Sequence, residues 1–363
     1  MGNVNPPGPV STANPLLRQV LAFVIFALAV GLGGCSVRQA AVRTLSSALV
    51  SGDANVFSTD DDPELIGQAL PFALKTLEAL IDLDPENAEL LLTTCSSYTQ
   101  YTYAYVELEA ERLRPKSFRE SRRVRERAVK LYLRARDYCL KALDVRRPGA
   151  SAGLLRDSAT TLASFDESDV SLLYWTAGSW GSAISNGRHR SELLIDLEVV
   201  RQVLGRTLEL DEDYGRGVLH DAMVALAALP EAMGGSYEQA QIHYRRAVEL
   251  NGDRRVGSHL NWAWLVMIGR QDRAGFEAAL DKALSVRSSD EAEEDRLANA
   301  VNRDFARFLR DQADELFLDD LEDDDFEDVD FENMDDGSVQ DPESAGNLDE
   351  DGKISEKNGD LRR

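Results

Sequence analysis

Apolar residues recur at three- and four-residue spacing from Asp60 to Leu318, and no segment there alternates convincingly with the two-residue period of a strand. This is the spacing of amphipathic helices that bury one face. Turn residues divide the pattern into separate helices. In "DDDPEL" (60–65), for example, Asp suits a helix cap and Pro63 suits the first turn. The pattern therefore predicts an all-α domain over residues 60–318.

The predicted helices share a motif of small and large residues. In "SYEQAQIHYRRAVELNG", Ala240, Tyr244 and Ala247 stand at i, i+4 and i+7, and Gly252 ends the helix. This is the pattern of the second helix of a tetratricopeptide repeat, in which small residues let paired helices approach and each pair stacks on the next. Four more stretches have the spacing: Ala73-Leu77-Leu80, Ala135-Cys139-Ala142, Val200-Leu204-Thr207 and Phe276-Leu280-Ala283. We therefore expect a tetratricopeptide-like helical-repeat superhelix or bundle, with a generic helical bundle as the alternative.

A short apolar run near the N-terminus indicates export. It reaches from Val20 to Leu32 and follows Arg18, whereas a membrane-crossing helix needs about 20 residues. These features are typical of a secretory signal peptide. The letters "LGGC" that end at Cys35 resemble a bacterial lipobox, in which the cysteine thiol receives the lipid. The sequence thus predicts a signal peptide over residues 1–34 and acylation (palmitate) at Cys35, with a weak transmembrane helix as the alternative.

A lipidated Cys35 would hold the mature chain at the periplasmic face of a bacterial membrane. Ser36 favours the outer membrane, because the Asp associated with inner-membrane retention is absent. Residues 35–59 are then expected to form a tether and a first helix. Cys95 and Cys139 lie at apolar-periodic helical positions, so we expect two buried free thiols. A disulfide, which an oxidising periplasm permits, is the alternative.

The net charge of −24 is concentrated near the C-terminus. Between Asp314 and Asp351 there are 19 Asp or Glu residues and no Lys or Arg. Few apolar residues and many like charges predict a disordered acidic tail over residues 319–363. Within it, "NLDEDGKISEKN" resembles a calcium loop but has Asn358 where strong sites have Glu. The weak calcium candidates are Asn347, Asp349 and Asp351, and no other metal site or cofactor is expected.

Positive charge gathers between Arg112 and Arg147, where 14 Lys or Arg residues face four acids. The simplest interpretation is a solvated helix face. The alternatives are a membrane-surface patch, an attraction for anionic ligands, or a dock for the acidic tail. Nucleic acid is not an expected partner in the periplasm.

Two aromatic stripes are candidates for lining a ligand site. In the first, the three residues are three, four and seven apart and so share one helix face, and tyrosine combines an apolar ring with a polar tip. Packing between repeats is the alternative for both stripes. The candidates are Tyr98, Tyr101 and Tyr105 in "YTQYTYAY", and Tyr174, Trp175 and Trp180 in "LLYWTAGSWGSAIS".

Catalysis has little support in the sequence. The four histidines show no HExxH or comparable metal-ligand spacing, and there is no GxSxG elbow and no phosphate loop. We therefore expect a protein that is not an enzyme.

Several phrases together resemble the T component of tripartite ATP-independent periplasmic (TRAP) transporters, the TatT family. They include "DDDPELIGQALPFALKTLEALIDLDPENAELLLTTCSSYTQ", "DVSLLYWTAGSWGSAIS", "LDEDYGRGVLHD" and "RLANAVNRDFARFLRDQADELF", in this order. The resemblance covers about residues 40–318; the acidic tail lies outside it. It implies a periplasmic lipoprotein that forms trimers with a pore, takes a hydrophobic or organic-acid ligand and associates with a solute-binding P component. The alternative is a scaffold lipoprotein that binds proteins of the cell envelope and no small molecule.

Overall fold

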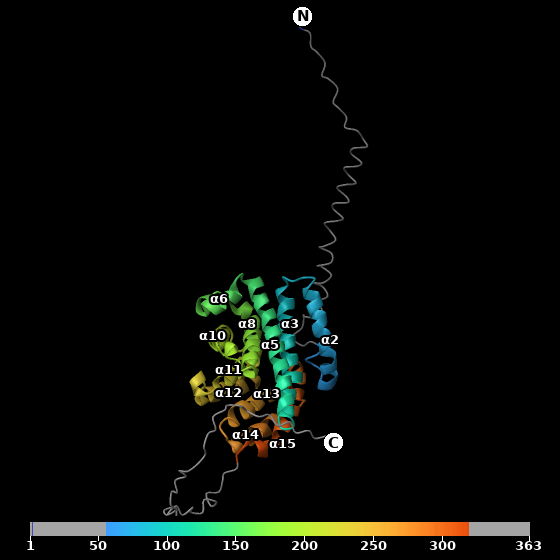
Figure 1. Ribbon diagram of the computed structural model, residues 1–363, viewed down its shortest axis with the longest axis vertical. Helices are drawn as coiled ribbons and strands as arrows, with labels where there is room; N and C mark the ends of the chain where they lie inside the picture. Colours follow the sequence, from blue (N-terminus) through green and yellow to red (C-terminus); the bar gives the residue numbers. More distant parts are fainter. Residues whose placement is uncertain (1, 3–55, 319–363) are drawn as a thin grey trace, which may run out of the picture. The chain divides into compact units, whose positions relative to one another are not determined.

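A computed structural model describes residue 2 and residues 56–318 of the protein, and it contains no strand within them (Figure 1). The prediction of an all-α fold is confirmed. The elements are α2 (Pro63–Ile81), α3 (Ala88–Thr102), η1 (Tyr103–Glu107), α4 (Leu108–Leu113), α5 (Phe118–Arg146), α6 (Ala150–Arg156), α7 (Ser158–Leu162), η2 (Glu167–Asp169), α8 (Val170–Asn186), α9 (Ser191–Leu194), α10 (Leu197–Leu210), η3 (Tyr214–Arg216), α11 (Val218–Ala227), η4 (Glu231–Met233), α12 (Tyr237–Asn251), α13 (Val256–Asn261), η5 (Trp262–Met267), α14 (Arg273–Ser285), η6 (Glu293–Asp295), α15 (Arg296–Asp311) and α16 (Ala313–Leu316).

The first helices form a layer in which α2 packs on α3, α3 on α5, and α5 on α8. Helix α2 begins where the sequence predicts. The carboxylate of Asp62 accepts a hydrogen bond from the backbone N–H of Leu65 at 3.0 Å, and Pro63 is the first helical residue. The helix then continues through Pro71 without a break, so that one helix spans the whole apolar segment.

The residues of the small-large-small motif lie in α2, α5, α10, α12 and α14, and most of them are buried. In α12, Ala240 and Ala247 are fully buried, while Tyr244 is half-buried. Helix α12 ends at Gly252, whose φ of +63° is readily adopted by glycine. The motif therefore marks inward-facing positions, while the tetratricopeptide-like stacking itself stays a prediction.

Buried apolar side chains form two clusters. The first is made mainly of residues from the elements α2 through α10, and it contains Leu90, Tyr132 and Trp180. The second is made mainly of residues from the elements α11 through α15, and it contains Phe276 and Phe305. Two π-helical turns, η1 and η5, directly follow α3 and α13. Turns of this kind are rare and occur often at functional sites.

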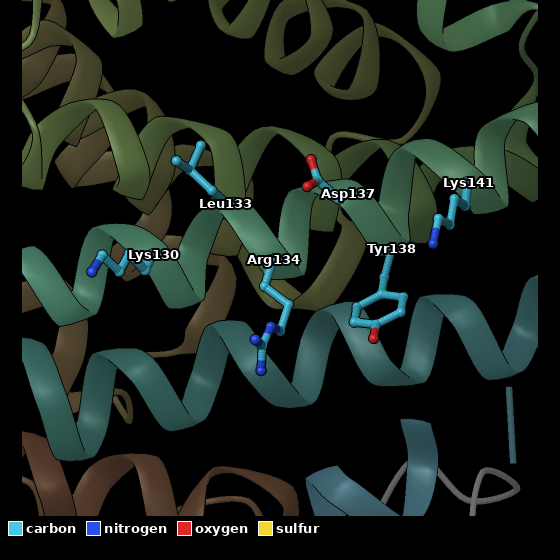
Figure 2. A pocket seen from close by; sticks show the side chains of 6 residues that line it. All are labelled: Lys130, Leu133, Arg134, Asp137, Tyr138 and Lys141. Atoms are coloured by element: carbon cyan, nitrogen blue, oxygen red, sulfur yellow. The ribbon is translucent and has the colours of Figure 1, made fainter. Parts of the chain in front are cut away.

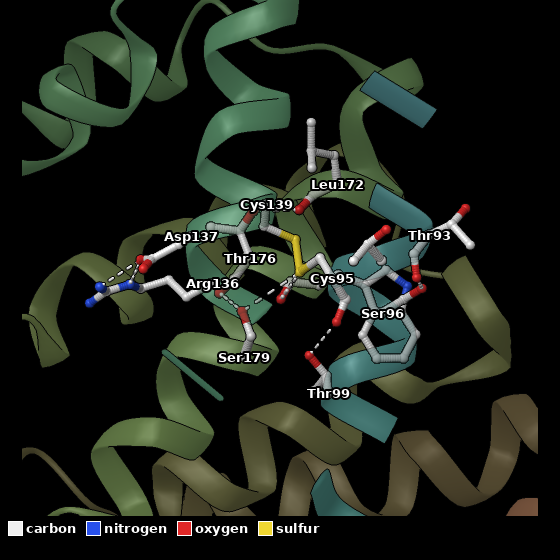
Figure 3. Close-up of a disulfide and its surroundings, with 12 residues drawn as sticks. Thr93, Cys95, Ser96, Thr99, Arg136, Asp137, Cys139, Leu172, Thr176 and Ser179 are labelled. Atoms are coloured by element: carbon white, nitrogen blue, oxygen red, sulfur yellow. Dashed lines mark hydrogen bonds and ion pairs between the residues drawn. A yellow bond between two sulfur atoms is a disulfide. The ribbon is translucent and has the colours of Figure 1, made fainter. Parts of the chain in front are cut away.

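A disulfide joins Cys95 of α3 to Cys139 of α5, with the two Cα atoms 5.5 Å apart (Figure 3). The prediction of two free thiols is therefore wrong. Helical periodicity places both cysteines on buried faces correctly, and neither side chain is exposed. Helical periodicity does not predict how α3 and α5 are aligned along each other. This alignment is what brings the two sulfur atoms within bonding distance. Thr176 and Ser179 of α8 lie beside the bond.

Several predictions concern residues outside the described part of the chain. These are the signal peptide, the acylated Cys35, most of the tether over residues 35–59, the acidic tail, and the calcium candidates. Among the described residues, none of the helices is long and apolar enough to cross a lipid bilayer.

Candidate functional site

The first aromatic stripe lies between helices α2, α3 and α5. Tyr98 and Tyr101 are 3% and 9% exposed. The hydroxyl of Tyr98 donates a hydrogen bond to Glu78 of α2 at 2.8 Å, and that of Tyr101 accepts one from Arg127 of α5 at 3.4 Å. The buried hydroxyl of Tyr105 has no hydrogen-bond partner. These contacts show that the stripe packs between helices, and its role in lining a ligand site stays a prediction.

In the second stripe, one side chain is fully buried and two are partly accessible to solvent. Trp180 is 1% exposed, and its indole N–H donates a hydrogen bond to Asp196 at 3.2 Å. Tyr174 and Trp175 are half-buried, with ring centroids 4.9 Å apart. The ring of Tyr214 lies 5.5 Å from that of Tyr174. Tyr174 therefore keeps a face that another molecule can contact, whereas Trp180 does not.

A group of polar side chains lies where the two apolar clusters meet, and we call Tyr103, Glu107, Tyr174 and Asp221 the central polar cluster. Tyr103 and Glu107 come from the π turn η1, Tyr174 from α8 and Asp221 from α11. Tyr174 packs against the first apolar cluster and Tyr103 against the second. Burial raises the pKa of Tyr103, and the nearby carboxylates of Glu107 and Asp221 raise it further. The four side chains therefore interact electrostatically.

Asp221 has one partnered and one unpartnered carboxylate oxygen. Oδ2 accepts a hydrogen bond from the hydroxyl of Ser258 at 3.0 Å, and that hydroxyl accepts one from Asn251 at 3.0 Å. Oδ1 is buried and has no hydrogen-bond partner. Burial raises the pKa of Asp221 to about 6, although the positive charge of Arg255 opposes the shift. The carboxyl group thus takes up a proton close to neutral pH.

Hydrogen bonds fix the other polar groups of η1. The hydroxyl of Tyr103 donates to Asn302 of α15 at 2.8 Å. The hydroxyl of Tyr132 on α5 donates to the carboxylate of Glu107. Burial raises the pKa of Glu107, while hydrogen bonds from Tyr132 and Asn186 oppose the shift. The π turn is thereby tied to α5, α8 and α15 at once.

The central polar cluster combines burial with partial accessibility. Burial raises the pKa of all four side chains, yet each keeps part of its surface accessible. Such side chains are withdrawn from bulk water without being covered completely by protein atoms. Sequence reasoning named only Tyr174 among them. Acids within the otherwise apolar phrases "YAYVE" and "VLHDAMVALA" were the signal that could have revealed Glu107 and Asp221.

Three of the four histidines lie in two separate groups. Nδ1 of His220 lies 2.9 Å from Nδ1 of His243, and its Nε2 lies 3.2 Å from a carboxylate oxygen of Glu212. His259 lies between the hydroxyl of Tyr244 and the carboxylate of Asp253. Among residues 56–318 and residue 2, no group of three or more His, Cys, Asp or Glu side chains is placed to hold a metal ion.

A shallow basic groove of ≈ 340 Å³ follows the outer face of α5 (Figure 2). Arg134 and Tyr138 point from α5 toward the neighbouring helix, where the ring of Tyr138 stacks on Tyr98 at 6.1 Å. Lys130 and Lys141 lie farther along the groove on either side. The basic segment predicted from the sequence is therefore largely a helix face.

Comparison with known proteins identifies the family to which this chain belongs. The family of TRAP transporter T-components matches residues 59–317, which is more than half of the chain. An uncharacterized protein of Treponema pallidum (strain Nichols) is 28% identical over 304 residues, covering 79% of this chain and 94% of the relative. Proteins of this family are accessory components of transporters, and the family is not a known enzyme family. The chain therefore belongs to the TRAP transporter T-component family.

Proposed function

We propose that the protein is an accessory periplasmic lipoprotein of a TRAP-type uptake system. In this proposal it binds or channels a hydrophobic or organic-acid ligand at the central polar cluster and docks the solute-binding P component. Family membership supports the transport role. The observation that carries the ligand site is the unpartnered, buried Oδ1 of Asp221 beside two half-buried tyrosines.

The chemistry of the cluster suits an amphipathic acid. The rings of Tyr103 and Tyr174 offer apolar surface, and their hydroxyls are protonated at neutral pH, as an ordinary tyrosine hydroxyl is; burial raises their pKa values further. A protonated Asp221 can donate a hydrogen bond from Oδ1 to a ligand carboxylate, and Arg255 adds positive charge nearby. An ionised Asp221 would repel the same carboxylate. Binding is therefore expected to strengthen as the pH falls through about 6.

Anchoring and assembly complete the proposal. An acylated Cys35 would hold the protein at the periplasmic face of a bacterial membrane, with the outer membrane favoured. A homotrimer would bring three copies of the cluster together. Of the lining candidates, Tyr174 belongs to the cluster, and Trp175 contacts it directly.

Native mass spectrometry of the exported chain from residue 36 to 363 tests the proposal. We expect a trimer that carries a co-purified small molecule, and we expect Tyr174→Ala and Asp221→Leu to lose that molecule while circular dichroism stays helical. Asp61→Leu, at an exposed position, is the matched control and should keep the ligand. A monomer that carries no ligand in any preparation would contradict the uptake role.

A scaffold lipoprotein that binds an envelope protein without a small molecule is the second candidate. It is favoured by the burial of Tyr98, Tyr101 and Trp180, which fill spaces between helices. Pull-down with the purified P component separates the two functions. Binding that depends on Asp221 and on added ligand supports uptake, whereas capture of another envelope protein by ligand-free protein supports the scaffold.

A further inference from the structure

The beginning of α5 carries an exposed aromatic residue within a group of cations. Phe118 is 72% exposed. The cations around it in the chain are exposed as well, in the turn after α4 and the first turns of α5. We call this surface the basic end of α5; it consists of Arg114, Lys116, Phe118, Arg119 and Arg122.

The charge of this surface is largely uncompensated. In the described part of the chain, Lys116, Arg119 and Arg122 take part in no ion pair, and Arg114 reaches Glu111 only at 4.0 Å. The neighbouring Glu120 is engaged by Arg123 at 3.0 Å. Free cations at this density attract an anionic partner.

The starts of α2 and α5 lie toward the same end of the helix layer. Helices α2, α3 and α5 are joined by short turns and pack side by side, so α2 and α5 both begin at the end of the layer where α4 finishes (Figure 1). A contact near the start of α2 supports this, since Gly67 lies against the ring of Tyr105 in η1.

A second loop adds positive charge to the same end. The turn after α8 contains the exposed Arg188, and its neighbours His189 and Arg190 bind Glu126 on the first half of α5. Helix α2, which carries acids at its start, packs mainly on α3. The basic end therefore faces outward as a cationic surface with one aromatic side chain at its centre.

We propose that the basic end of α5 binds an anionic phospholipid surface, with Phe118 entering the headgroup region. Clustered Lys and Arg residues bind anionic lipid additively, by roughly fivefold per cation. An aromatic side chain among cations is typical of interfacial membrane contacts, because it gains from leaving water while the cations hold the headgroups. An acidic protein surface would explain the cations but not the exposed Phe118.

Co-sedimentation of the chain from residue 36 to 363, without acyl groups, with lipid vesicles tests this proposal. The vesicles contain about 30% phosphatidylglycerol in phosphatidylcholine, and pure phosphatidylcholine is the reference. We expect binding only to the anionic vesicles, weakening as salt is raised. Lys116→Glu, Arg119→Glu and Arg122→Glu combined should reduce binding by about 100-fold or more. Phe118→Ser should reduce it by roughly five- to tenfold.

The matched control reverses three other exposed cations that form no ion pair in the described part of the chain. It combines Arg156→Glu, Arg245→Glu and Lys282→Glu, which change the net charge by the same amount. We expect the control to bind as the unmodified chain does. Equal losses in both triple variants, or no preference of the unmodified chain for anionic vesicles, would overturn the proposal; the second result would point to an acidic protein partner instead.

Discussion

Replacing Asp221 by asparagine should change how the stability of the protein depends on pH. Burial raises the pKa of this carboxyl to about 6, against 3.8 in an exposed setting. Because the folded-state pKa lies above the unfolded-state pKa, the folded protein takes up the proton first. Stability therefore rises as the pH falls through 6 and stops rising below about 3.8. Between about pH 8 and pH 5 the unmodified protein should gain about 1.4 kcal/mol that Asp221→Asn does not gain.

Urea unfolding followed by far-ultraviolet circular dichroism at both pH values gives this difference directly. The titration of other groups, including the His220 and His243 pair, is common to both proteins and cancels in the comparison. Asp61→Asn, which alters an exposed carboxylate, is expected to track the unmodified protein. If the unmodified protein and Asp221→Asn change in parallel, Asp221 is hydrated in solution and the ligand site built on it is wrong.

Two further predictions concern packing. Replacing Cys95 and Cys139 together by alanine should lower the free energy of unfolding by about 4 kcal/mol, because the bridge closes a loop with a sequence separation of 44 residues; an unchanged urea midpoint would show that the bridge does not constrain the unfolded chain. Gly67→Ala should destabilise the protein despite a gain of about 1 kcal/mol in helix propensity, since the added Cβ would lie 2.6 Å from a tyrosine ring. Gly205→Ala has open space around its Cβ and should be stabilising in the same assay, so similar effects at both glycines would contradict the structure.

Local patterns were sufficient to predict most of the architecture. Helical periodicity and the small-large-small motif identify buried positions in five helices, such as Ala135 and Cys139 in α5. Capping chemistry identifies the first residue of α2, because Asp62 and Pro63 satisfy the helix start within four residues of chain. Buried positions and helix caps depend on residues that are close in the sequence, so they can be predicted from the sequence alone.

Features that depend on the register between helices could not be predicted in the same way. The disulfide requires α3 and α5 to face each other at one level, which no local pattern specifies. The central polar cluster draws Tyr103, Tyr174 and Asp221 from three separate helices, and the π turn η1 determines where Tyr103 lies. Helical spacing singled out Tyr98, Tyr101 and Tyr105 on one face and gave no partner for Tyr103, whose hydroxyl bonds to Asn302 of the distant helix α15.

The bridge between α3 and α5 has a consequence for how the chain must be produced. Cysteines oxidise in pairs outside the reducing cytosol, so material made inside ordinary bacterial cells would carry two extra hydrogens and lack a link between its first helices. Such a preparation would still be helical by spectroscopy and would pass as native. Thiol titration of each batch is therefore the appropriate quality check before melting or partner assays are compared between laboratories.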